Sequence, residues 1–131
     1  MHNPKTNASK ITRLENGDLK ASVAGVSFVN DDGTSRQAAI EQTKAYLDGD
    51  SKVPVFIEKE PTNKWDKNAI KVFVEVEGKK LQVGYIAKGI NVEILRVWDS
   101  IDGGTVLSAG KSSRNSLWGM YIRLISKEDS K

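Results

Sequence analysis

Apolar and polar residues alternate along much of the chain, which is the pattern of β-strands with one buried face. The clearest case is residues 69–76, where every second residue is Ile or Val. A Glu-Gly turn follows, and a second alternating run at 79–86 completes a predicted β-hairpin. The same pattern predicts four more strands, at residues 19–28, 53–59, 105–109 and 117–125.

Two segments have the 3.6-residue apolar period of an amphipathic helix. The first begins at Thr34, which fits a capping box with Gln37, and it ends before Gly49, a residue suited to the C-terminal cap. The second covers residues 88–103 and ends at a glycine pair. Its apolar stripe consists of Ile90, Ile94, Val97, Trp98 and Ile101.

The order of these elements predicts a mainly β (α+β) protein. About six strands and two helices without regular β-α-β alternation indicate an antiparallel sheet or small barrel with the helices packed against it. The length of 131 residues fits one domain. We expect that domain at residues 18–126, after a flexible N-terminal leader at 1–17 and before a disordered tail at 127–131.

The composition argues against several kinds of site. The chain has no cysteine, and its one histidine is His2, near the N-terminus. We therefore expect no disulfide, no zinc or haem site, no cofactor and no common nucleophile–base pair, so an enzyme is not predicted. The Gly-Lys-Ser sequence at 110–112 lacks the upstream glycine of a phosphate-binding P-loop and precedes a strand, so we interpret it as a hairpin loop.

Net charge and hydropathy narrow the range of partners. The formal charge of +3 and pI near 9.1 permit a polyanionic partner without requiring one. No apolar run approaches the ~20 residues of a membrane helix, and residues 1–10 lack the apolar core of a signal peptide. We therefore expect a cytoplasmic protein with no membrane partner.

The segment between two predicted strands, EPTNKWDKNAIKV at 60–72, places a tryptophan beside an aspartate. Together with VAGVSF, the preceding VPVFIEK and the later LQVGYIAKGI, it resembles the HIRAN family. That family's signature combines a Pro-containing loop, an Asn, an aromatic-Asp pair, an Asn-Ala-Ile-x-Val strand and a Val-Gly-aromatic turn. The resemblance covers Ala21 to about Leu95 and is weak beyond Ser108.

The resemblance implies a modified OB-type barrel of six antiparallel strands with attached helices. It also implies binding of single-stranded DNA at a free 3′-hydroxyl end. By position, Trp65 would stack on the terminal base, Asp66 would accept a hydrogen bond from the 3′-hydroxyl, and Lys88 would contact a phosphate. Asn63 falls on a pocket position. Tyr85 stands where some members have His.

One departure from the family concerns the first strand, where Ser27-Phe28 replaces an Arg-Tyr pair. The resemblance therefore implies that Phe28 keeps an aromatic face while an arginine contact is lost. Stacking on an aromatic ring contributes about 1–3 kcal/mol per base and tolerates any base. An ionised carboxylate only accepts hydrogen bonds, so Asp66 would favour a hydroxyl over a phosphate. Lys64, Lys67, Lys71 and Lys88 would neutralise nearby phosphates.

Structural roles for the same residues compete with this interpretation. Trp65 can cover the end of the barrel, and Asp66 can form an Asx turn with the amide of Asn68. Trp118 can belong to the core or to a groove wall. The leading hypothesis is a module for single-stranded DNA ends in DNA repair, replication or processing, with a helicase, another ATPase or a further repair protein as partner. The alternative is a protein-interaction adaptor on the same scaffold, and a nuclease is a distant third.

Overall fold

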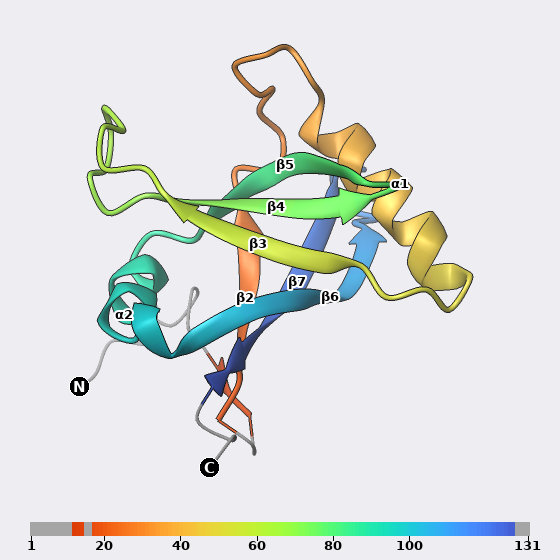
Figure 1. Cartoon of the computed structure of the whole chain (residues 1–131). Coiled ribbons are helices and arrows are strands. Elements are labelled where there is room, and N and C mark those ends of the chain that lie inside the picture. Colours follow the sequence, from red (N-terminus) through yellow and green to blue (C-terminus); the bar gives the residue numbers. More distant parts are fainter. Residues whose placement is uncertain (1–11, 15–16, 128–131) are drawn as a thin grey trace, which may run out of the picture.

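The computed structural model describes residues 12–14 and 17–127. Within them, a mainly β protein has six antiparallel strands closed into a barrel, one extra strand and two α-helices (Figure 1). The predicted fold class is confirmed. The strands are β1 (Thr12–Arg13), β2 (Leu19–Ala24), β3 (Pro54–Lys59), β4 (Ile70–Val76), β5 (Lys79–Ile86), β6 (Ile101–Lys111) and β7 (Trp118–Ser126). The helices are α1 (Arg36–Asp48), α2 (Ile90–Arg96) and a short 3₁₀ helix at Trp98–Ser100.

Most of the predicted leader and tail lies outside the described residues. Residues 1–11, 15–16 and 128–131 are not described, so His2 falls outside the structure. Two residues of the predicted leader, Thr12 and Arg13, form β1 and pair with β2. Neither α-helix in the described ranges has the length and hydrophobicity that a membrane span needs.

The barrel closes through β2, which changes its partner along its length. Its first four residues pair with β7, from Leu19 opposite Leu124 to Ser22 opposite Tyr121. Its last residue, Ala24, pairs with Tyr85 of β5. The strand order β2-β5-β4-β3-β6-β7 therefore returns to β2, and closure leaves those six strands without a free sheet edge.

Gly84 allows this closure. A Cβ at this position would lie 2.3 Å from the carbonyl oxygen of Ala24 and 2.7 Å from Cγ1 of Val23, and the backbone has φ +155°. The register between β4 and β5 also shifts here, between Val72 and Phe73. The bulge and the missing side chain let β2 approach β5 closely. The close approach sets the position of Tyr85.

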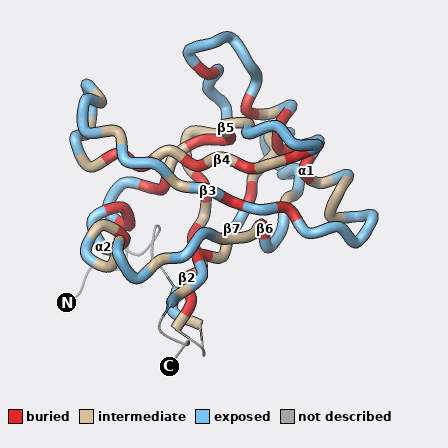
Figure 2. The backbone as a smooth tube through the Cα atoms, in the orientation of Figure 1, coloured by how far each residue is buried: buried red, intermediate tan, exposed pale blue. Residues whose placement is uncertain are grey.

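The barrel interior is filled by the alternating apolar residues of the strands. In β4 every second residue is buried, as the sequence predicts (Figure 2). Helix α1 lies against β5, β6 and β7 and contributes buried Ile40 and Thr43. The helix begins differently from the prediction, because Ser35 rather than Thr34 is the N-cap and its Oγ accepts from the Ala38 amide at 3.0 Å.

Three predicted boundaries are wrong. The strand predicted at 19–28 ends at Ala24, because Gly25 has φ +69° and starts a turn in which the Phe28 amide bonds the Gly25 carbonyl at 3.2 Å. The second helix ends at Arg96 instead of residue 103. Its last stripe residue, Ile101, begins β6, which runs to Lys111 and is longer than the predicted 105–109.

The Gly-Lys-Ser sequence lies at a β-hairpin, as predicted. Gly110 and Lys111 end β6, and the Ser112 amide bonds the Leu117 carbonyl at 2.9 Å across the loop to β7. A strand follows this loop, whereas a P-loop is followed by a helix. The hairpin is therefore no phosphate cradle of that type.

Candidate nucleic-acid interface

A groove with a volume of about 780 Å³ opens at one end of the barrel. We call it the main groove. Its lining residues come from the end of β2 and the following segment to α1, from the β3–β4 loop, and from the end of β5 with the start of α2. Six of the seven predicted site residues line it, namely Phe28, Asn63, Trp65, Asp66, Tyr85 and Lys88. The seventh, Lys67, is exposed nearby but is not part of the lining.

The β3–β4 loop holds Trp65 on a frame of hydrogen bonds. Across its base, the Glu60 amide bonds the Ala69 carbonyl at 2.9 Å. Within it, Oδ1 of Asn63 accepts from the amides of Trp65 at 2.8 Å and Asp66 at 2.9 Å. The indole of Trp65 is 84% exposed, so it does not cover the barrel core. Asn63 thus shapes the loop, and the tryptophan is displayed on it.

Asp66 is held by two donors. Its Oδ1 accepts from the Asn68 amide at 2.9 Å, which is the Asx turn of the competing structural interpretation, and its Oδ2 accepts from Nδ2 of Asn91 at 2.9 Å. The hydrogen bonds from Asn68 and Asn91 lower the pKa of Asp66, outweighing its partial burial, and the charge of Lys88 lowers this pKa further. Each oxygen keeps acceptor capacity, because a carboxylate has about four lone-pair sites. The Asx turn fixes the carboxylate in the groove wall.

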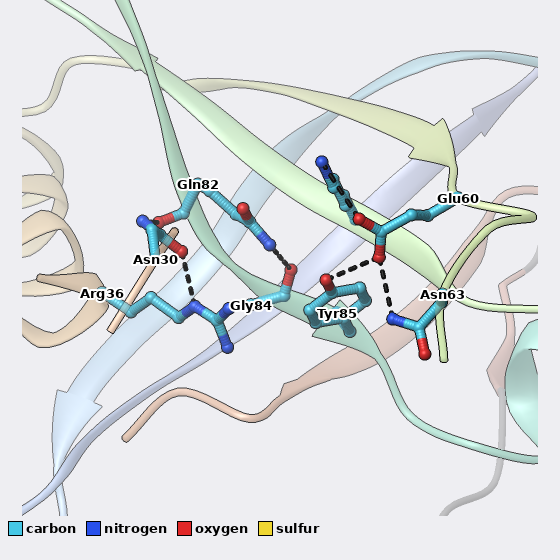
Figure 3. Close-up of polar contacts among 8 residues, drawn as sticks. Asn30, Arg36, Glu60, Asn63, Gln82, Gly84 and Tyr85 are labelled. Atoms are coloured by element: carbon cyan, nitrogen blue, oxygen red, sulfur yellow. Dashed lines mark hydrogen bonds and ion pairs between the residues drawn. The ribbon is translucent and has the colours of Figure 1, made fainter. Parts of the chain in front are cut away.

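A second carboxylate, Glu60, also lines the groove and joins three other side chains (Figure 3). Its Oε1 accepts from Nδ2 of Asn63 at 2.8 Å and from the hydroxyl of Tyr85 at 2.7 Å, and its Oε2 pairs with Nζ of Lys71 at 3.3 Å. Burial opposes its ionisation, but the bonds from Asn63, Tyr85 and Lys71 outweigh burial and lower the pKa of Glu60. Lys71 is therefore paired with Glu60, and its predicted contact with a phosphate stays a prediction.

Arg36 is a groove residue that the sequence analysis missed. It is the first residue of α1, only 7% exposed, and its guanidinium lies 5.3 Å from the ring centroid of Tyr85, which Figure 3 places between Arg36 and Glu60. Nε donates to Oδ1 of Asn30 at 2.6 Å, and Nη1 donates to the Gly25 carbonyl at 2.8 Å.

Among the described residues, no carboxylate forms an ion pair with Arg36 within 4.0 Å. Its Nη2 makes no hydrogen bond within that part of the chain. Nη2 is also not a buried atom lacking a partner, so solvent reaches it. Buried charges are ordinarily paired. An anion in the groove would provide the missing partner. Ser27, which stands where the family has an arginine, is exposed and does not line the groove.

Asn91 was also missed. It is 1% exposed, and besides orienting Asp66 it accepts from the Gly89 amide at 3.2 Å, ahead of α2. A buried Asn on an otherwise apolar helix face is a signal that the sequence does contain, because such a side chain must find hydrogen-bond partners. Arg36 gave a similar signal as a charged residue at the start of an amphipathic helix.

The groove is mixed in charge. Its lining carries three basic side chains, Arg36, Lys64 and Lys88, and three acidic ones, Asp31, Glu60 and Asp66. Nζ of Lys64 lies 6.0 Å from the Trp65 ring centroid, and Phe28 adds a second exposed ring at 67%. Such a site combines flat apolar surfaces, fixed acceptors and a few cations. No cluster of three or more His, Cys, Asp or Glu side chains suited to a metal occurs in the described part of the chain.

Comparison with known families assigns this fold. The model of the HIRAN domain matches residues 16–117. The chain belongs to the HIRAN domain family. HIRAN is a binding domain, and the family is known for binding nucleic acids.

The solved structures include one similar HIRAN domain, that of human HLTF. The crystal structure of that domain has 20% sequence identity and a TM-score of 0.48, and the match covers 92% of this chain and 82% of that chain. No curated protein matches the sequence.

Proposed function

We propose that this HIRAN domain binds single-stranded DNA at a 3′-hydroxyl end and holds the terminal nucleotide in the main groove. One observation carries the proposal: an exposed indole and a fixed carboxylate are neighbours on one hydrogen-bonded loop at the groove wall. The family's nucleic-acid binding supports the class of ligand.

Stacking would provide most of the affinity. Trp65 and Phe28 both expose their rings to the groove and make no demand on base identity. The loop frame keeps Trp65 in place before a ligand arrives, so less conformational entropy is lost on binding.

Asp66 would select the end. An ionised carboxylate accepts a hydrogen bond from the 3′-hydroxyl, whereas it repels a terminal phosphate or the phosphodiester of an internal nucleotide. Because its pKa is lowered, Asp66 carries this charge at neutral pH.

The cations would hold the phosphate that precedes the terminal nucleoside. Lys88 is exposed beside Asp66, and Arg36 has a spare guanidinium nitrogen and no carboxylate partner in the described residues. A guanidinium on a rigid mount binds phosphate oxygens well. Arg36 would thus supply the arginine contact that Ser27 cannot.

We place the domain beside enzymes of DNA repair, replication or processing, which create and consume free 3′ ends. A helicase, another ATPase or a further repair protein would be its partner. The domain would mark or position the end for that enzyme.

The experiment is a fluorescence anisotropy titration with an oligothymidine that ends in a 3′-hydroxyl. Trp65→Ala should weaken binding by about 5- to 150-fold, the loss of one stacked base. Phe56→Ala is the matched control, because Phe56 is an exposed ring on β3 outside the groove lining, and it should leave affinity unchanged. If the wild type does not bind at low salt, the protein-interaction adaptor replaces this proposal.

A further inference from the structure

A second concave surface lies at the far end of the β6–β7 hairpin. Its volume is about 520 Å³, and it is lined by Val26, residues 108–112, Asn115 and residues 117–121. We call it the hairpin groove. None of its lining residues belongs to the main groove.

The hairpin groove has two aromatic rings, each with a lysine near its face. Nζ of Lys111 lies 5.9 Å from the ring centroid of Trp118, and Nζ of Lys20 lies 5.0 Å from that of Tyr121. Tyr121 is 48% exposed, and no Asp or Glu is among the described residues that line the groove. Aromatic platforms beside cations are how proteins hold single strands without reading their sequence.

Two glycines leave open space in the lining of the hairpin groove. Gly110 and Gly119 are directly opposite each other in the β6–β7 ladder. A Cβ at either position would meet nothing within 4 Å. Bare backbone at this point leaves room for a flat group to approach the strands.

The hairpin groove adjoins the main groove. The two share the turn after β2, where Gly25 and Phe28 line the main groove and Val26 lines the hairpin groove. Strand β2 links them as well, since Ala24 pairs with Tyr85 in the main groove and Ser22 pairs with Tyr121 in the hairpin groove.

The side chain of Gln37 fixes this junction. Its Nε2 donates to the Val26 carbonyl at 3.0 Å and to the Trp118 carbonyl at 2.9 Å. Its Oε1 accepts from the Trp118 amide at 2.7 Å. Helix α1 therefore ties the turn after β2 to the start of β7, at the point where the lining residues of the two grooves come closest in the chain.

We propose that the hairpin groove binds the nucleotides on the 5′ side of the terminal one, so that a single strand of DNA runs from the main groove across the 25–28 turn onto Trp118 and Tyr121. The inference rests on the proposed function, which places the 3′ end in the main groove. Continuity with that groove and the lack of acidic lining residues favour a nucleic-acid strand as the occupant. One OB-type domain covers about 4–16 nucleotides of a single strand, so a binding path longer than the terminal nucleotide is ordinary for such a domain.

The test compares a thymidine dinucleotide with an oligothymidine of about ten nucleotides, both ending in a 3′-hydroxyl. The wild type should bind the longer ligand more tightly. Tyr121→Ala and Lys111→Ala, two exposed positions, should each remove much of that gain, and Tyr121→Ala should weaken the longer ligand by about 5- to 150-fold. Both variants should bind the dinucleotide as the wild type does, measured by NMR titration of backbone amides.

The experiment distinguishes a failure of this inference from a failure of the proposed function. Ile125→Ala changes another exposed apolar residue of β7 outside the hairpin groove and should have no effect. This inference would be overturned if Tyr121→Ala and Lys111→Ala bound the longer ligand as tightly as the wild type. The proposed function would still stand if Trp65→Ala weakened the binding of both ligands. If Trp65→Ala left both ligands unaffected, the proposed function itself, and the shared path with it, would be wrong.

Discussion

At the scale of single residues, the site depends on two carboxylates with different tasks. Glu60 is satisfied by Asn63, Tyr85 and Lys71 and joins these three side chains. Among the described residues, Asp66 accepts from the Asn68 amide and the Asn91 side chain, so it keeps lone pairs for a ligand. The pKa of both groups is lowered by their hydrogen-bond donors.

These lowered pKa values predict the pH dependence of binding. Asp66 should stay ionised throughout, so affinity for a 3′-hydroxyl oligothymidine should be constant from about pH 5 to pH 8 and fall only below about pH 4. Titrations by anisotropy at constant ionic strength measure this. A midpoint near neutral pH would contradict the assignment of Asp66 as an acceptor that is always charged.

The stability of the fold against unfolding should also decrease at low pH. A carboxylate with a lowered pKa in the folded state stabilises the fold at pH above its unfolded-state pKa, and this contribution is lost as pH falls through the folded-state value. Glu60 and Asp66 both belong to this case, so urea unfolding midpoints should drop below about pH 4.

The sequence predicted some of these residue roles and missed others. Trp65 and Asp66 are adjacent in the sequence, and the Asx turn depends only on the spacing of Asp66 and Asn68. Both features could therefore be predicted from the sequence. Arg36 and Asn91 reach the groove from helices that are distant along the chain. Only the closed barrel brings those helices beside the β3–β4 loop.

At the scale of elements, local turn chemistry decides which boundaries are predictable. The β4–β5 hairpin was predicted almost to the residue from two alternating runs joined by Glu77-Gly78. In the structure, Glu77 and Gly78 have positive φ, 54° and 77°, as a tight hairpin turn requires. The apolar stripe through Ile101 made the predicted second helix too long. An apolar residue at a helical spacing also fits the start of a strand, and Ile101 begins β6. The exposed face of β6 has no apolar alternation to mark its length.

The β2–β5 junction gives a prediction about an element contact. Gly84→Ala should destabilise the protein by about 1–3 kcal/mol or more, because the new Cβ would overlap the Ala24 carbonyl and the backbone φ of +155° disfavours a side chain. Chemical denaturation measures the change. Gly119→Ala, a strand glycine with open space around it, is the control and should cost much less. Equal stability of both variants would contradict the tight closure at Gly84.

At the scale of the whole molecule, the charge is modest and mixed. The formal net charge is +3, and the main groove has three basic side chains against three acidic ones. Long-range electrostatic attraction to DNA should therefore be weak, and local contacts should dominate.

This balance predicts a shallow dependence on salt. If the phosphate contacts are the three described cations that line the groove, Arg36, Lys64 and Lys88, the logarithm of affinity for a short 3′-hydroxyl ligand should fall with the logarithm of salt concentration at a slope of about −2. Anisotropy titrations at several salt concentrations give the slope. A much steeper slope would indicate a broad basic surface as the main contact, contrary to a groove that recognises an end.

The most direct measurement of the central claim is the affinity ratio between two oligothymidines that differ only in a 3′-hydroxyl or a 3′-phosphate, for the wild type and for Asp66→Asn. Asparagine keeps the size of the side chain and can accept from the Asn68 amide, but it lacks the charge. We predict that the wild type prefers the hydroxyl by about tenfold or more, the effect of roughly 1.4 kcal/mol, and that Asp66→Asn loses this preference. Equal binding of the two ends by the wild type would contradict the account.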